Sequence, residues 1–169
     1  LGGSKMRPWS VLAATLLLSS CASAPPIPPE LQYTPPVGDA SLLATIGGNI
    51  VDSKVPLFDN ENSYTYAIDG KRVMSRKKDW GLPIPVLPGD RTITAGFEQG
   101  VYMAYAKVDA TLVAGHAYQV HSSCNTRGLG AKFSHCDFWI VDSATGKAIS
   151  EIARGAIGGR PPVVLLLPR

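Results

Sequence analysis

The sequence is poor in charge, in aromatic residues and in cysteine. Charged residues make up 17% of its 169 residues, aromatic residues make up 8%, and there are 3 cysteines. The surplus of Lys and Arg over Asp and Glu gives a formal net charge of only +3, too small to indicate nucleic acid as the partner of the whole chain. Because 45% of the residues are hydrophobic, disorder throughout is excluded, and the length suits one modest domain with loops.

Catalytic signatures are missing as well. The chain contains no G-x-S-x-G elbow, no H-E-x-x-H pair and no phosphate-binding P-loop. His116 follows Gly115 at an expected turn, and we expect backbone or solvent to satisfy its ring. No acid/base pair stands out by spacing among Asp52, Asp59, Glu61, Asp137 and Asp142. We therefore expect a protein that is not an enzyme and holds no cofactor.

The first 20 residues have the pattern of an export signal. Residues 1–5 are expected to be an extension outside the fold, and residues 6–20 carry a basic residue, an apolar run from Val11 to Leu18 and small residues. A membrane core of about 30 Å requires about 20 apolar residues in a helix, so this run is too short to cross it. We interpret residues 6–20 as a signal peptide.

The signal ends in Leu18-Ser19-Ser20-Cys21, which resembles the lipobox of bacterial lipoproteins. The resemblance implies that the Cys21 thiol is diacylated, that the signal is cut before it, and that the new amino terminus is acylated. Several acyl chains anchor a protein stably, because each buried CH₂ contributes about 0.8 kcal/mol. By analogy with lipoprotein sorting in Gram-negative bacteria, Ala22-Ser23 after the cysteine, without Asp, favours the outer membrane over the inner one. The alternative is an ordinary signal peptide with a cysteine there by chance.

Residues 21–38 are predicted to be a lipidated, proline-rich tether ahead of one domain over residues 39–169. Each proline fixes φ and lacks an N–H, so this segment suits neither a helix nor a central strand. At about 3.1 Å per residue, a polyproline-like spacer of this length reaches about 50 Å from the membrane. A flexible tether of no fixed length is the alternative.

The rest of the chain shows strand and turn signals without a convincing amphipathic helix. Apolar runs predict strands at 64–68, 92–97, 101–108 with a continuation over 110–113, 118–121, 138–141, 148–152 and 163–167. Asp69-Gly70 suits a type I′ hairpin turn and Pro88-Gly89 a type II turn. Short strands at close spacing predict an all-β fold, specifically an antiparallel β-sandwich of about seven or eight strands, immunoglobulin-like or transthyretin-like.

Four short turn motifs follow one another within residues 64–150. They are Ala67-Ile68-Asp69-Gly70-Lys71, Val86-Leu87-Pro88-Gly89, Ala114-Gly115-His116-Ala117-Tyr118 and the turn from Asp142 to Lys147. Their order resembles that in a broad set of largely uncharacterised bacterial lipoproteins with small periplasmic β-sandwich domains. The resemblance implies a fold and a compartment but no catalytic residue. Transthyretin-like lipoproteins of type VI secretion complexes are similar in size and architecture, although no motif here selects them.

Cys124 and Cys136 are the two remaining cysteines, and they flank a loop between predicted strands. In an oxidising periplasm such a pair most simply forms a disulfide, which would stabilise the domain by about 2–4 kcal/mol. Zinc bound by His121, Cys124, His135 and Cys136 is the alternative. Neighbouring residues of a strand point to opposite faces, which makes joint ligation by His135 and Cys136 awkward.

Residues 71–80 hold the densest positive charge in the sequence. A solvated hairpin or loop explains such a run without a ligand. The functional alternative is an anion-binding face for phosphate or carboxylate, in which Arg makes bidentate contacts and Trp80 stacks. Its members would be Lys71, Arg72, Arg76, Lys77, Lys78 and Trp80.

These features predict an outer-membrane lipoprotein, facing the periplasm, that works as a non-catalytic binding or assembly module. Its expected partners are an envelope protein or an anionic glycan or lipid, and the compartment excludes nucleic acid. The alternative is an accessory structural subunit of a secretion, pilus or other envelope complex, with residues 163–167 or a sheet edge donating a strand. A metal-binding protein or an enzyme is the third class.

Overall fold

A computed structural model of the chain describes residues 26–53, 59–124, 135–158 and 161. Within these ranges the chain forms nine β-strands, three short 3₁₀-helices and no α-helix, so the prediction of an all-β fold is confirmed. No helix in the described ranges is long and apolar enough to cross a membrane. The signal peptide, Cys21 and the strand predicted over 163–167 lie outside the described residues.

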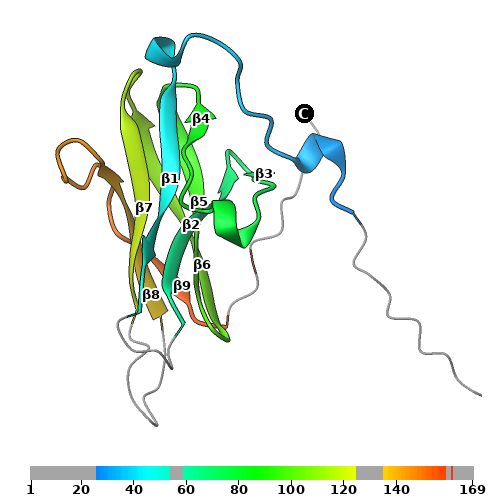
Figure 1. Ribbon diagram of the computed structural model, residues 1–169, viewed down its shortest axis with the longest axis vertical. Helices are drawn as coiled ribbons and strands as arrows, with labels where there is room; N and C mark the ends of the chain where they lie inside the picture. The colour runs from blue at the N-terminus through cyan, green and yellow to red at the C-terminus, as the bar shows by residue number, and fades with distance from the viewer. Residues whose placement is uncertain (1–25, 54–58, 125–134, 159–160, 162–169) are drawn as a thin grey trace, which may run out of the picture.

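The nine strands form one mixed sheet that curls into a nearly closed barrel (Figure 1). They are β1 (Ala44–Val51), β2 (Glu61–Ile68), β3 (Lys71–Arg72), β4 (Ile84–Val86), β5 (Gly89–Gln99), β6 (Tyr102–Leu112), β7 (Ala117–Cys124), β8 (His135–Asp142) and β9 (Ala153–Ala156). The 3₁₀-helices are η1 (Pro29–Leu31), η2 (Ala40–Leu42) and η3 (Lys77–Asp79). The strand order is β6-β5-β2-β1-β7-β8-β9, with β3 on β2 and β4 on β1. A bridge between Ala104 and Ile157 brings the two ends of this order together.

Strand β1 divides its pairing between two groups of strands. Its first half pairs in parallel with β7, with Ile46 opposite Tyr118, and antiparallel with β4. Its second half pairs antiparallel with β2, with Ile50 opposite Asn62. The expectation of a purely antiparallel fold is therefore wrong at β1. The two separate facing sheets of a sandwich are not confirmed, because β1 joins both groups into one sheet.

The core fills the inside of the barrel and is built from alternate residues of the strands, as period-two patterning requires. Ile93, Ala95 and Phe97 point inward from β5, as their alternation predicts. Tyr118 and Val120 do the same from β7. The largest fully buried side chains are Phe97, Phe138, Ile46, Ile68, Ile93, Leu112 and Ile140.

The turn predicted after residue 68 forms where the sequence offers residues that tolerate positive φ. Asp69 and Gly70 both have positive φ, 48° and 76°, as a type I′ turn between β2 and β3 requires.

The prediction of a strand over 148–152 is wrong, because β9 begins only at Ala153. The Ser150 hydroxyl accepts a hydrogen bond from the Ile140 N–H (2.9 Å), so a side chain replaces the backbone partner that a continuing strand would offer.

Part of the segment predicted as a tether lies against the domain. The Tyr33 N–H donates to the Arg72 carbonyl, and the Tyr33 hydroxyl donates to the Pro85 carbonyl, both at 2.8 Å. Gln32 forms a bridge with Arg72. Burial raises the pKa of the Tyr33 hydroxyl above its ordinary value. The domain therefore engages the chain from residue 32, ahead of the boundary expected at residue 39.

Candidate functional site

The two cysteines of the domain lie at disulfide distance. Cys124 of β7 and Cys136 of β8 are direct cross-strand partners, and their sulfur atoms are 2.00 Å apart. Their Cα atoms are 4.2 Å apart, which suits a closely spaced antiparallel pair. The expected pairing is therefore present, and it ties the end of β7 to the start of β8.

The geometry does not support zinc binding by His121, Cys124, His135 and Cys136. A sulfur engaged in a disulfide is not a thiolate ligand, and no group of three or more His, Cys, Asp or Glu side chains in the described ranges could hold a metal ion. His121 Nδ1 lies 3.5 Å from Asn49 Nδ2 of β1 instead. Burial lowers the pKa of His121 below its ordinary value.

The basic segment is largely engaged within the domain. The Arg72 guanidinium donates to the Tyr66 hydroxyl and lies 4.0 Å from the centre of the same ring. Arg76 pairs with Asp79 at 2.9 Å, and Lys77 pairs with a carboxylate of β5. Among the described contacts, Lys71 and Lys78 are the members of this segment with no internal partner. An anion would therefore meet two unengaged cations here rather than five.

Trp80 packs against a tyrosine instead of standing free. Its ring stacks on Tyr64 with centroids 3.7 Å apart and an angle of 9° between the planes. Gly96 of β5 provides the space beneath Tyr64, since a Cβ at Gly96 would lie 2.6 Å from the Tyr64 Cζ. One face of the Trp80 ring is therefore covered by Tyr64 on the outer surface of the sheet.

His116 has a carboxylate partner, so the expectation that backbone or solvent satisfies its ring is wrong. Its Nδ1 lies 2.8 Å from Asp142 Oδ2. The other Asp142 oxygen accepts from the N–H groups of Ala144 and Thr145, at 3.0 and 2.9 Å. The hydrogen bond from His116, followed by that from the Thr145 N–H, lowers the pKa of Asp142 from 3.8 to about 2. These contacts fix the turn after β8.

Acid is expected to remove the stabilisation that Asp142 provides. Because its pKa is lower in the folded chain than its ordinary 3.8, the contribution is complete above about pH 4 and is lost as the pH falls toward 2. An Asp142→Asn variant should have a lower Tm than the wild type at neutral pH, and the difference should shrink between pH 4 and 2. Thermal unfolding at a series of pH values measures it. A difference that stays constant down to pH 2 would contradict this role.

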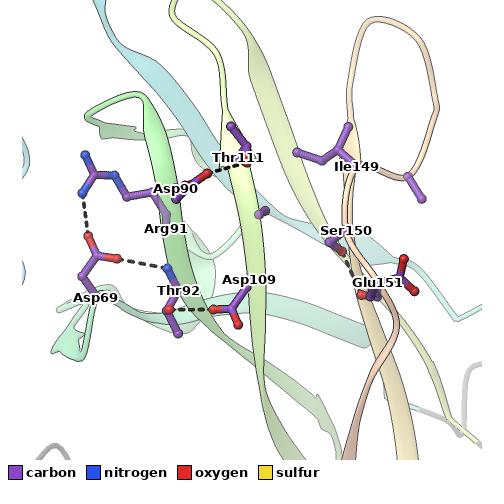
Figure 2. A pocket seen from close by; sticks show the side chains of 11 residues that line it. Asp69, Asp90, Arg91, Thr92, Asp109, Thr111, Ile149, Ser150 and Glu151 are labelled. Carbon is purple, nitrogen blue, oxygen red and sulfur yellow. Dashed lines mark hydrogen bonds and ion pairs between the residues drawn. The ribbon is translucent and has the colours of Figure 1, made fainter.

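Within the part of the chain that the structure describes, the barrel is closed along only part of the seam between β6 and β9. At one end the Gly158 N–H donates to the Met103 carbonyl at 2.8 Å. Further along β6 the facing chain is residues 148–151, which pair with β8 instead. Between β6 and residues 148–151 lies an open cleft of about 650 Å³, which we name the seam cleft (Figure 2).

Two hydroxyl–carboxylate pairs lie on one side of the seam cleft. Thr92 Oγ1 donates to Asp109 Oδ1, and Thr111 Oγ1 donates to Asp90 Oδ1, both at 2.6 Å. Each pair joins residues that are directly opposite in the register of β5 and β6. Figure 2 shows these pairs across the cleft from Glu151.

The seam cleft is acidic. Asp69 is neutralised by Arg91, whose Nη1 lies 3.0 Å from Asp69 Oδ2 and whose remaining nitrogens donate to backbone carbonyls. Asp90, Asp109 and Glu151 have no ion-pair partner among the described residues. The carboxylates near the cleft therefore outnumber the cations available to pair with them.

Neither the seam cleft nor its carboxylates were predicted from the sequence. One signal could have revealed the paired side chains: Asp-x-Thr occurs at 90–92 and again at 109–111. In adjacent antiparallel strands, such a repeat places the Asp of each strand opposite the Thr of the other. Glu151 has no such signal, because its position depends on the bend at Ser150.

Comparison with known proteins identifies no relative. No protein family, no curated protein and no solved structure matches the chain.

Proposed function

We propose that this chain is an outer-membrane lipoprotein, attached through Cys21 and facing the periplasm, whose β-domain is a non-catalytic binding or assembly module. The observation that carries the proposal is the partly open seam of the barrel. Among the described residues, the barrel closes on itself at one end of β6, and at the other end the side of β6 that faces away from β5 has no strand partner. That side is an edge available to a second chain.

The use of a strand edge also supports the role of an assembly subunit in an envelope complex. Strand addition joins proteins through backbone hydrogen bonds and needs no catalytic group. We also propose that the β-domain is a variant of the immunoglobulin-like or transthyretin-like sandwich. The support for this assignment is β1, which divides its pairing between two groups of strands as a strand shared by two sheets would.

Site-specific photocrosslinking in living Gram-negative cells tests the proposal. A photoreactive residue at Thr111, exposed on the open part of β6, should form an adduct with an envelope protein. The same residue at Val37, fully exposed ahead of the domain, should form none. Adducts at Thr111 should be lost in a Cys21→Ser background, because that chain is not held at the membrane.

Two other outcomes would count against this function. Adducts at Lys78 but not at Thr111 would favour the basic segment as the binding face. Membrane attachment that survives Cys21→Ser would contradict the lipid anchor. Radiolabelled palmitate incorporated by the wild type and not by the variant is the matching chemical measurement.

A further inference from the structure

We propose that the seam cleft takes up an extended peptide segment of alternating basic and apolar residues, which pairs with β6 as an additional strand. This inference rests on the proposed function and names the chemistry of the partner. Three features of the described residues support it: the orientation of the β6 backbone, the charge along the cleft and the apolar side chains beneath it.

The backbone of β6 is oriented to pair at the cleft. The Met103 carbonyl accepts from Gly158, so it points away from β5. Backbone groups of alternate residues in a strand point to the same side, so those of Lys107, Asp109 and Thr111 also point away from β5. Among the described residues, no backbone group beyond β5 pairs with these three. They form a row of donors and acceptors next to the cleft.

Closure at the other end of the seam sets the geometry of an added strand. Ile157 and Gly158 already lie against Ala104 and Met103, antiparallel to β6. Pairing along this edge is therefore compatible with the fold. An added strand would continue it toward Thr111, with residues 148–151 on its far side.

The charge along the cleft determines which side chains an added strand would present outward. Asp90 and Asp109 lie on the outer face of β5 and β6, and Glu151 lies across the cleft. On β6 itself, which lies within the described ranges, the one cation is Lys107, at the outward position two residues before Asp109. Outward residues of an added strand would approach two or three carboxylates that have no ion-pair partner, so Lys or Arg is favoured there.

The opposite face of an added strand would meet apolar surface. Ala110 is buried on the inner side of β6, and Ile149 packs against the core from the other side of the cleft. Because side chains alternate along a strand, a residue between two outward basic ones would point to this surface. Small apolar residues such as Val suit these positions.

Synthetic peptides test the proposal against the full chain purified in a neutral detergent. The probe is an eight-residue peptide of alternating Lys and Val with blocked ends. We expect it to slow hydrogen exchange of the Lys107, Asp109 and Thr111 amides at least tenfold. A Glu-Val peptide of the same length should bind at least tenfold more weakly, and so should a Lys-Val peptide N-methylated at alternate residues, which cannot pair with the edge.

Variants of the carboxylates separate charge recognition from stability. Asp90→Asn and Asp109→Asn keep the oxygen that accepts the threonine hydroxyl, and together they should weaken Lys-Val binding at least fivefold with little change in Tm. Glu30→Gln, at an exposed position that does not line the cleft, should leave binding unchanged. Equal affinity for Lys-Val and Glu-Val peptides would overturn the proposal, and so would the absence of protection on β6.

The remaining outcomes assign the cleft to other occupants. If a peptide of residues 161–169 binds more tightly than the Lys-Val peptide, the occupant of the cleft is the chain's own C-terminal segment. Concentration-dependent dimerisation abolished by N-methylated Lys-Val would give the cleft to a second copy. Either result overturns the proposed partner. If Thr111 crosslinks to an envelope protein but Lys-Val does not bind, the binding function stands and only the charge class of the partner is wrong.

Discussion

A Gly155→Ala variant is expected to lose about 3 kcal/mol of unfolding free energy, the upper part of the range for an overpacked interior. Gly155 lies in β9 where that strand approaches β6 at the closed end of the seam. A Cβ at this position would overlap the carbonyl group of Tyr105, a backbone atom that cannot rotate away as the end of a side chain can. The two strands must therefore move apart, and Phe138 offers no space on the other side.

Urea unfolding measures the loss, and hydrogen exchange localises it. The Gly158 amide, which donates to Met103, should exchange much faster in the variant because the strands no longer meet. Gly38→Ala is the matched control, since a Cβ there meets nothing within 4 Å. If both variants unfold at the same urea concentration, the close approach of β9 to β6 does not contribute to stability.

Removal of the disulfide is expected to cost about 2–4 kcal/mol. A Cys124→Ala/Cys136→Ala variant keeps the cross-strand register of β7 and β8. It no longer restricts the unfolded chain, in which the bond joins two residues separated by 12 positions. The measurement is the urea midpoint of the double variant against the wild type. Cys21→Ala provides the control and should leave this midpoint unchanged.

Reduction supplies an independent check on the same bond. The wild type with excess reductant should unfold at the midpoint of the double variant, because both lack the same constraint. A wild type insensitive to reductant, together with a destabilised double variant, would mean that the loss comes from packing around the fully buried Cys136.

Local features of the fold were predictable because their causes are local. Asp69-Gly70 forms the expected turn since both residues tolerate positive φ. The inward faces of β5 and β7 follow from alternation over a few residues. The pairing of Cys124 with Cys136 follows from two cysteines placed across one hairpin.

Features that depend on distant partners were not predictable in this way. β1 contains Gly47, Gly48 and Asn49, which weaken any strand pattern, and it is held by β7 and β2 rather than by its own propensity. The parallel pairing of β1 with β7 has no local signal. The seam cleft combines residues of β5 and β6 with residues beyond β8, so only the closure of the barrel brings them together.

The divided pairing of β1 has a consequence for how quickly the domain folds. Asn49 of β1 and His121 of β7 are neighbours separated by 72 residues of chain. Contacts of such long range slow folding, and β-rich domains of this kind typically need milliseconds to seconds. A chain that emerges from a membrane with its amino terminus first would present β1 long before β7 is available. Until β7 appears, the first half of β1 would have only β4 as a pairing partner. β1 is therefore the first strand to appear and one of the last whose pairing is complete.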